Sequence, residues 1–312
     1  MNNINSNKHI SVRLEDAVDS LNIQKDKIYV DCTFGRGGHS FEILKRLSSK
    51  GKLFVFDLDL DAKKYFDNNF SKFKNCFFIQ DNFKNLKENL AKFDISKVDG
   101  FLFDFGVSSP MLDNANRGFS FKLDARLDMR MNQNQELSAY EVINNYSKEK
   151  LIQIFWKYGE IRNPVPVVDE IIKYRSNKPI ETTLELVDII RKRTPIKIQR
   201  EKKHFARTYF QAIRIEVNDE LNSIRKALSD ALNMLSKNGR IVTISFHSLE
   251  EKEIKNTYKD VLESKIPKEV PINNSFDFKI IKIKPKRASS SELEENNRTR
   301  SSFLKVIERV NE

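Results

Sequence analysis

The sequence predicts an α/β fold in which a mostly parallel sheet is interrupted by a helical insertion, and two observations carry this prediction. In the first third of the chain, short apolar runs typical of strands alternate with amphipathic runs typical of helices. This alternation predicts βαβ units, whose parallel strands are covered by helices on both faces. From about residue 113 to 210 the strand-like runs disappear, and a span of that length is too long for a simple loop.

The elements are expected in the following order. Strands are predicted over residues 27–33, 52–59, 76–80 and 98–106, with helices over 39–47, 61–70 and 83–91 between them. In the insertion, apolar residues recur at helical spacing over 151–158 and 168–172, and Thr182 with Glu185 forms a capping-box pattern. The βα pattern then resumes, with a helix over about 219–236 that is ended by Asn238-Gly239, a strand over 240–246, a helix from Leu249, and late strands over 278–284 and 303–309.

This order predicts a discontinuous main domain, residues 1–112 and 213–312, and a helical insertion domain, residues 113–212. The main domain has the pattern of a Rossmann-like sheet. Its two late strands are expected to pair as an antiparallel edge.

The charge of the chain favours a polyanionic partner. The 312 residues include 55 Lys and Arg against 44 Asp and Glu, a formal net charge of +11. Such a surplus attracts nucleic acid by long-range attraction and counterion release, although a genomic bias towards Lys, Asn, Ile and Phe is the alternative. Basic runs occur at 191–203, 282–287 and 298–300. One such run is usually a solvated face, but three favour an RNA-backbone role for at least one of them.

Several classes of protein are disfavoured. Cys32 and Cys76 lie in apolar strand-like runs, so core positions are expected for them, and neither a disulfide nor a metal site. No apolar stretch reaches the roughly 18 residues that span a bilayer. Residues 1–8 lack the apolar region of a secretory signal. We therefore expect a cytoplasmic protein with no membrane partner and no metal.

A glycine-rich loop, residues 31–39, follows the first expected strand. In an open parallel sheet, ligands bind where the carboxyl ends of strands meet helix N-termini. Gly37 and Gly38 would let the backbone pass close to a ligand, and the helix N-terminus offers unpaired N–H groups. Asp57, at the end of the second strand, is placed to accept hydrogen bonds from ribose hydroxyls. The loop and this acid predict an adenosine-type cofactor, either a dinucleotide or S-adenosylmethionine.

The neighbouring residues favour S-adenosylmethionine. A dinucleotide loop needs a third glycine where this chain has Ser40. Asp31 suits a cationic methionyl group better than a pyrophosphate. Phe83 follows the third strand, where its ring would flank an adenine, and Asp104 ends the fourth strand beside the expected reactive methyl group. His39 either binds the cofactor or caps its helix.

Asp104 is also the candidate catalytic residue. An exocyclic amine is a poor nucleophile, because its lone pair is delocalised into the ring. A carboxylate or carbonyl that accepts its N–H bonds favours a pyramidal nitrogen and aligns the lone pair with a sulfonium methyl. Asp104 and the carbonyls of the loop after it are candidate acceptors, and the alternative is that Asp104 contacts only the cofactor. Neither a metal nor a covalent intermediate is required.

Motifs along nearly the whole chain resemble one family, the MraW family of small-subunit ribosomal RNA N4-cytosine methyltransferases. No motif is specific alone, but together and in order they are: DCTFGRGGHS (31–40), DGFLFDFGVSSP (99–110), RGFSF (117–121), LDMRM (127–131), TYFQAIRIEVNDE (208–220) and ISFHSLE (244–250). The resemblance implies a class I S-adenosylmethionine-dependent methyltransferase fold with an insertion for substrate recognition. It further implies methylation of the N4 of a cytidine in the decoding region of 16S ribosomal RNA, with the small ribosomal subunit as partner.

The resemblance also implies site residues. Cofactor contacts are expected from Gly37, Gly38, His39, Asp57, Phe83, Asp104 and Met111. Substrate contacts are expected from Ser108, Pro110, Arg117, Phe119, Arg130 and His247. Arg117 and Phe119 equally fit a role in locking the insertion onto the sheet, and His247 equally fits a structural role.

The chain departs from the family pattern at a few positions. Met111 stands where the family usually has Gln, so only a backbone or van der Waals role carries over to it. Ala125, Arg126, Asn132 and Ile161 also differ from the usual residues. These positions bear on local substrate contacts and not on the reaction.

Three other functions fit parts of the sequence. DNA amine methyltransferases usually show Asp-Pro-Pro-Tyr after the fourth strand, which is absent. A dehydrogenase is disfavoured by the missing third glycine and the basic insertion. A noncatalytic RNA-binding or ribosome assembly factor on a methyltransferase scaffold is disfavoured because the glycine loop, Asp57 and Asp104 are all intact.

Overall fold

The computed structural model of the chain describes residues 11–262, 277–282, 299 and 302–311. The chain forms two compact units. Unit 1 comprises residues 1–106 and 221–312, and unit 2 comprises residues 107–220. Unit 2 is therefore longer at each end than the insertion domain expected over 113–212. The role of this domain in substrate recognition stays a prediction.

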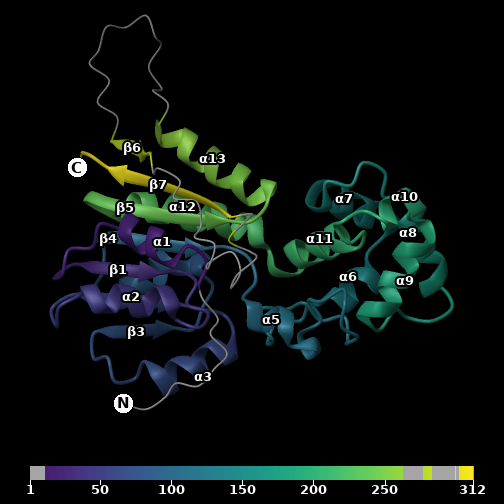
Figure 1. The fold of residues 1–312 in the computed structure, drawn as a ribbon, viewed down its shortest axis with the longest axis horizontal. Helices are drawn as coiled ribbons and strands as arrows, with labels where there is room; N and C mark the ends of the chain where they lie inside the picture. Colours follow the sequence, from purple (N-terminus) through teal and green to yellow (C-terminus); the bar gives the residue numbers. More distant parts are fainter. Residues whose placement is uncertain (1–10, 263–276, 283–298, 300–301, 312) are drawn as a thin grey trace, which may run out of the picture. The chain divides into compact units, whose positions relative to one another are not determined.

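Within the described residues of unit 1, seven strands form one sheet, in the order β3-β2-β1-β4-β5-β7-β6 (Figure 1). Five strands are parallel: β1 (Ile28–Asp31), β2 (Lys52–Phe56), β3 (Cys76–Ile79), β4 (Val98–Asp104) and β5 (Leu235–Ser245). β7 (Phe303–Arg309) is antiparallel to β5, and β6 (Phe278–Ile281) is antiparallel to β7. The mostly parallel sheet and the antiparallel terminal pair are thus confirmed, while residues 283–284 of the expected strand lie outside the described residues.

Helices follow the parallel strands as the alternation predicts: α2 (Gly38–Arg46), α3 (Leu60–Asn69), the short 3-10 helix η1 (Phe83–Asn85) with α4 (Leu86–Ala91), and α13 (Ser248–Leu262). An additional helix, α1 (Leu14–Ser20), packs against α2 (Figure 1). The sequence did not predict α1, because its N-cap residue Arg13 has a left-handed φ of 51° and makes no side-chain cap bond.

The sheet of unit 1 is buried by apolar side chains from strands and helices. Tyr29, Val55 and Leu102 belong to a core cluster that also contains Ile43 of α2 and Phe66 of α3. Burial of these residues supplies most of the driving force for the βα packing. Both cysteines are buried and free, which confirms the core positions expected for them.

The helix before β5 ends earlier than the sequence predicts. α12 (Glu220–Met234) stops at Met234, and Leu235 already pairs with Val98. Regular pairing then resumes only at Arg240, opposite Gly100, so the residues between form an irregularity within β5. Asn238 adopts a left-handed φ of 63° there. The prediction that Asn238-Gly239 ends the helix was wrong, because a left-handed residue is typical both of a helix C-terminus and of a β-bulge.

Unit 2 is built from helices and loops, as the sequence predicts. Its helices are α5 (Ser109–Asp113), the 3-10 helix η2 (Ala115–Arg117), α6 (Ala139–Asn145), α7 (Lys148–Gly159), α8 (Val165–Arg175), α9 (Thr183–Arg193), α10 (Ile196–Gln199) and α11 (Arg207–Asn218). The predicted capping box at the start of α9 is present, with Thr182 and Glu185 bonded reciprocally. A core of its own, including Phe155, Leu186 and Ile213, holds the unit together.

Among the helices that the structure describes, none is both long enough and apolar enough to cross a membrane.

Candidate cofactor and active site

Three aspartates stand at the carboxyl ends of neighbouring parallel strands in unit 1. Asp31 ends β1, Asp57 follows β2 and Asp104 ends β4, and β1 lies between the other two strands. Asp31 is fully buried, whereas Asp57 and Asp104 are partly exposed. Because these strand ends meet at one edge of the sheet, three carboxylates gather where the sequence predicts a cofactor.

Hydrogen bonds tie the glycine-rich loop to this edge. The Gly35 N–H donates to Oδ2 of Asp57 over 2.7 Å. The Thr33 N–H donates to Oδ1 of Asp31 over 3.1 Å, and the Thr33 hydroxyl accepts from the Asp104 N–H over 2.8 Å. The loop therefore binds the carboxylates of Asp31 and Asp57 and the backbone of Asp104.

Burial makes two of these carboxylates reluctant to ionise. It raises the pKa of Asp31 to about 6, although the Ser40 hydroxyl donates to that carboxylate over 2.6 Å. Burial also raises the pKa of Asp57 to about 6, against bonds from the N–H groups of Gly35 and Asp59. A cationic ligand placed beside these groups would favour their charged forms. Their chemistry therefore fits a ligand that carries positive charge.

The three loop glycines differ in what a side chain at each position would meet. Gly37 has a φ of 70°, and a Cβ there would lie 2.5 Å from the Phe70 ring. A Cβ at Gly38 would collide with the Ser11 hydroxyl. Gly35 has a φ of 54°, and a Cβ there would have nothing within 4 Å. Protein packing thus explains Gly37 and Gly38, while Gly35 leaves open space beside Asp57.

Gly35 is a candidate site residue that the sequence prediction did not single out. It belongs to the predicted loop, but nothing in the spacing of the glycines distinguishes it from Gly37 and Gly38. One feature of the sequence could have identified it: Gly35 lies at the centre of the turn, before the residues that begin α2.

His39 is a buried residue of the first turn of α2, exposed by 4%. Its Nε2 lies 3.1 Å from the carbonyl oxygen of Val12. The explanation that His39 caps its helix was wrong, because the N-cap position belongs to Gly37 and carries no side-chain cap bond. Burial lowers the pKa of His39, against the opposing charge of Asp104, so the ring is neutral at pH 7.

Phe83 presents a partly exposed ring at the start of η1. Its centroid lies 6.0 Å from those of Phe103 and Phe105, which belong to β4 and the residue after it. These contacts hold the ring close to the strand that ends at Asp104. A partly exposed aromatic ring therefore lies near the carboxyl end of β4.

His247, just past β5, has a partner in unit 1. Its Nε2 lies 3.0 Å from Oε1 of Glu250. Glu250 is fully buried, and its Oε2 accepts the Phe246 N–H over 2.7 Å. This arrangement favours the structural alternative for His247.

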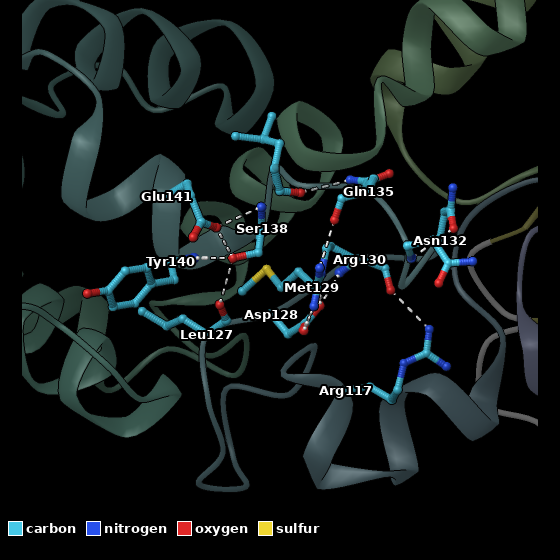
Figure 2. Close-up of polar contacts among 12 residues, drawn as sticks. Arg117, Leu127, Asp128, Met129, Arg130, Asn132, Gln135, Ser138, Tyr140 and Glu141 are labelled. Carbon is cyan, nitrogen blue, oxygen red and sulfur yellow. Dashed lines mark hydrogen bonds and ion pairs between the residues drawn. The ribbon is translucent and has the colours of Figure 1, made fainter.

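Two arginines of unit 2 organise the segment 127–135 (Figure 2). Arg130 binds Asp128 through Nη2 over 2.7 Å and Nε over 2.9 Å, and its Nη1 donates to the Gln135 carbonyl over 2.7 Å. Arg117, exposed by only 6%, donates to the Arg130 carbonyl over 3.0 Å. Both guanidinium groups thus stabilise a loop within unit 2.

Phe119 and Met111 are core residues of unit 2, exposed by 5% and 6%. Base stacking needs an open ring face, which this packing does not leave on Phe119, so we assign Phe119 to the core. Ser108 and Pro110 are partly exposed at the start of α5, where Ser108 is the N-cap residue without a side-chain cap bond.

A family model described as the MraW methylase family matches residues 6–310. The chain belongs to this family. It is 53% identical to the ribosomal RNA small subunit methyltransferase H of Ureaplasma parvum serovar 3 over 304 residues, which cover 96% of this chain and 98% of the relative. It is 48% identical over 307 residues to the protein of the same name from Clostridium botulinum strain 657, covering 97% and 99% of the two chains. A solved structure of an rRNA methylase from Streptococcus thermophilus is 12% identical and covers 97% of this chain and 99% of that one, with a TM-score of 0.43.

Membership of the MraW family confirms three predictions made from the motifs. The resemblance itself was correct, the fold class is that of the Rossmann-like methyltransferases, and the cofactor is S-adenosylmethionine. The individual cofactor and substrate contacts are not tested by the family match, and they stay predictions.

Proposed function

We propose that this MraW-family chain transfers a methyl group from S-adenosylmethionine to the N4 of a cytidine in the decoding region of 16S ribosomal RNA, within the small ribosomal subunit in the cytoplasm. The observation that carries the proposal is the edge of the sheet at which the glycine loop holds Asp31, Asp57 and Asp104. The names of the relatives support the RNA substrate, and the order of the motifs supports the cytidine amine.

The residues present fit S-adenosylmethionine. Asp57 offers carboxylate oxygens to ribose hydroxyls, and the open space at Gly35 admits a ligand beside it. Asp31 and Asp104 supply negative charge for a cationic methionyl group. Phe83 offers a ring face to the adenine. Gly37, Gly38 and His39 shape the loop that holds these groups. Only a backbone or van der Waals role carries over to Met111.

Asp104 is the proposed catalytic residue. When bound, S-adenosylmethionine supplies a methyl group that its sulfonium sulfur already activates. The Asp104 carboxylate and the backbone carbonyls after it accept the N–H bonds of the cytidine amine, which directs the nitrogen lone pair towards the methyl carbon. Methyl transfer to this nitrogen would break the carbon–sulfur bond of the cofactor, and water would take up the surplus amine proton. The Thr33 hydroxyl, bound to the Asp104 N–H, keeps the backbone of Asp104 in place.

The test is nucleoside mass spectrometry of 16S RNA after incubation with the protein and a labelled cofactor. Naked RNA and small ribosomal subunits are both used as substrates, because the stage of assembly that is recognised determines which is methylated. We expect labelled N4-methylcytidine at one position. Labelled cytidine methylated only at another atom, or no label on either substrate, contradicts the proposal.

Asp57→Ala and Asp104→Asn separate the two proposed roles. Asp57→Ala is expected to lose cofactor affinity, measured by titration calorimetry. Asp104→Asn is expected to bind the cofactor but to transfer the methyl group more slowly. Full methylation by both variants would favour the alternative that these carboxylates are structural. RNA binding by a chain that methylates nothing would favour the noncatalytic assembly factor.

A further inference from the structure

Several flat side chains stack on one another at the two ends of the basic run 191–203 in unit 2, together with a residue from the loop around position 121. The His204 ring stacks on Phe121, with centroids 4.6 Å apart and planes 21° apart, and on Phe205, at 4.4 Å and 23°. The guanidinium carbon of Arg191 lies 5.6 Å from the centroid of Phe205. We call Phe121, His204, Phe205 and Arg191 the stacking column.

The stacking column is anchored to the core at one end and open to solvent at the other. Phe121 meets the buried Phe210 edge to face, with centroids 5.9 Å apart. His204 and Phe205 are partly exposed, and Arg191 is exposed. A purely structural aromatic cluster would gain most stability by burying all of its faces. This one instead leaves its outer members accessible, Phe205 in part and Arg191 at the end of the column.

The middle ring of the column is neutral and oriented. Nδ1 of His204 accepts the Ala206 N–H over 3.2 Å, so the neutral ring carries its proton on Nε2. Burial and the positive charges of Arg191 and Lys122 lower the pKa of His204. A neutral ring stacks without the cost of desolvating a charge.

Four cations that shortly precede His204 in the sequence are free to bind an anion. Lys197, Arg200, Lys202 and Lys203 are exposed, and within the described part of the chain no carboxylate forms an ion pair with any of them. The cations one turn earlier differ, because Lys192 and Arg193 both lie within ion-pair distance of Glu170. The positive charge of Lys197, Arg200, Lys202 and Lys203 is therefore available to a partner.

We propose that the Phe205–Arg191 end of the stacking column binds an unpaired base of the RNA substrate, and that Lys202 and Lys203 hold the neighbouring phosphates. Every base has a flat face that stacks on aromatic rings or on a guanidinium plane, and its backbone carries the negative charge that these cations attract. A duplex buries its base faces, so the site selects single-stranded RNA. That the ligand is RNA rests on the proposed function, but the contact itself lies wholly in unit 2.

The test compares Phe205→Leu with Phe205→Tyr in the full chain. Leu retains apolar volume but removes the flat face, whereas Tyr retains the face. The affinity for a fluorescein-labelled single-stranded oligoribonucleotide, and for its duplex, is measured by anisotropy over a range of salt concentrations. Phe205→Leu is expected to bind the single strand about five-fold or more weakly. Its salt dependence is expected to be unchanged, because no phosphate contact is lost. Phe205→Tyr is expected to bind like the wild type.

A crosslinking experiment on the wild-type chain makes the same test without a substitution. Single-stranded RNA carrying 5-iodouridine is irradiated with the protein, and the modified peptides are identified by mass spectrometry. We expect adducts on His204 or Phe205. Adducts found only elsewhere, or equal single-strand affinity of the Leu variant and the wild type, would overturn the proposal.

The outcome is distinguishable from failure of the proposed function. If N4-methylcytidine is formed but Phe205→Leu binds RNA normally, only the stacking site is wrong. If Phe205→Leu binds RNA weakly but the wild type forms no N4-methylcytidine, the stacking site stands and the reaction assigned to the chain is wrong.

Discussion

Asp31 gives the chain a pH dependence that a single substitution removes. Burial raises the pKa of this carboxyl from 3.8 to about 6. Between these two values the folded state binds more protons than the unfolded state, so this contribution to stability is present at low pH and is lost as the pH rises through about 6. Asp31→Asn has no carboxyl to ionise at this position, so the variant should not lose stability in this way as the pH rises. The free energy of unfolding of the variant relative to wild type should therefore rise by about 1–3 kcal/mol between pH 4 and pH 7.5.

Urea unfolding at the two pH values measures this difference. Asp113→Asn, at an exposed position of α5, serves as the control for removing a surface carboxylate, and it should leave the pH profile close to that of the wild type. Identical profiles for Asp31→Asn and wild type would show that Asp31 is not the group responsible.

Gly35 and Gly37 allow cofactor binding to be separated from folding. Both have positive φ, so Ala introduces about 1 kcal/mol of backbone strain at either position. At Gly37 the new Cβ also meets the Phe70 ring, whereas at Gly35 it projects into open space beside Asp57. We expect Gly35→Ala to weaken S-adenosylmethionine binding roughly ten-fold or more, with a small loss of stability. Gly37→Ala should lose more stability.

Calorimetric titration and thermal unfolding of both variants check this prediction. Wild-type cofactor affinity in Gly35→Ala would place the cofactor away from this part of the loop.

At the scale of elements, a helix cap that the sequence predicts should contribute measurably to the free energy of unfolding. Thr182 accepts the Glu185 N–H at the start of α9, and the Glu185 carboxylate accepts the Thr182 N–H over 3.2 Å. Thr182→Ala removes one of these bonds and should lower the free energy of unfolding by about 1 kcal/mol. Thr208→Ala, exposed in the first turn of α11, should change it far less. Equal effects of the two substitutions, in denaturant titrations, would mean that the capping box contributes nothing specific.

Features set by residues close together in the sequence were predicted better than features that depend on residues far apart in it. The alternation of apolar runs and the Thr182–Glu185 pattern are local, and the strands, their mostly parallel arrangement and the capping box were predicted from them. The end of α12 was not, because Asn238-Gly239 has the same local conformation in a bulge as at a helix end.

The same distinction applies to the candidate site. Asp31, Asp57 and Asp104 were placed at neighbouring strand ends because parallel strands all end at one edge. The packing that requires Gly37 involves Phe70, which is far along the chain, and no local pattern reveals it. The burial of Phe119 in the core of unit 2 likewise depends on helices that follow it in the sequence.

At the scale of the whole molecule, the formal charge of +11 overstates what an RNA backbone meets. Arg191 pairs with Asp188, and Lys192 and Arg193 pair with Glu170, so part of the basic run 191–203 is already neutralised. Lys202 and Lys203 of the same run have no such pairs among the described residues. The runs 282–287 and 298–300 lie almost entirely outside the described residues. Ion pairing, and not the count of basic residues, therefore determines which cations release counterions on binding.

Two double variants of equal charge change test this point. Lys202→Gln with Lys203→Gln should reduce the slope of log affinity against log salt by up to about 1.4 for single-stranded RNA, since each lost phosphate contact removes about 0.7. Lys192→Gln with Arg193→Gln should reduce the slope less, because Glu170 already occupies those cations. Both variants should bind S-adenosylmethionine like the wild type. Equal reductions of slope would show that the ion pairs open when RNA binds, and that all four cations then contact phosphates.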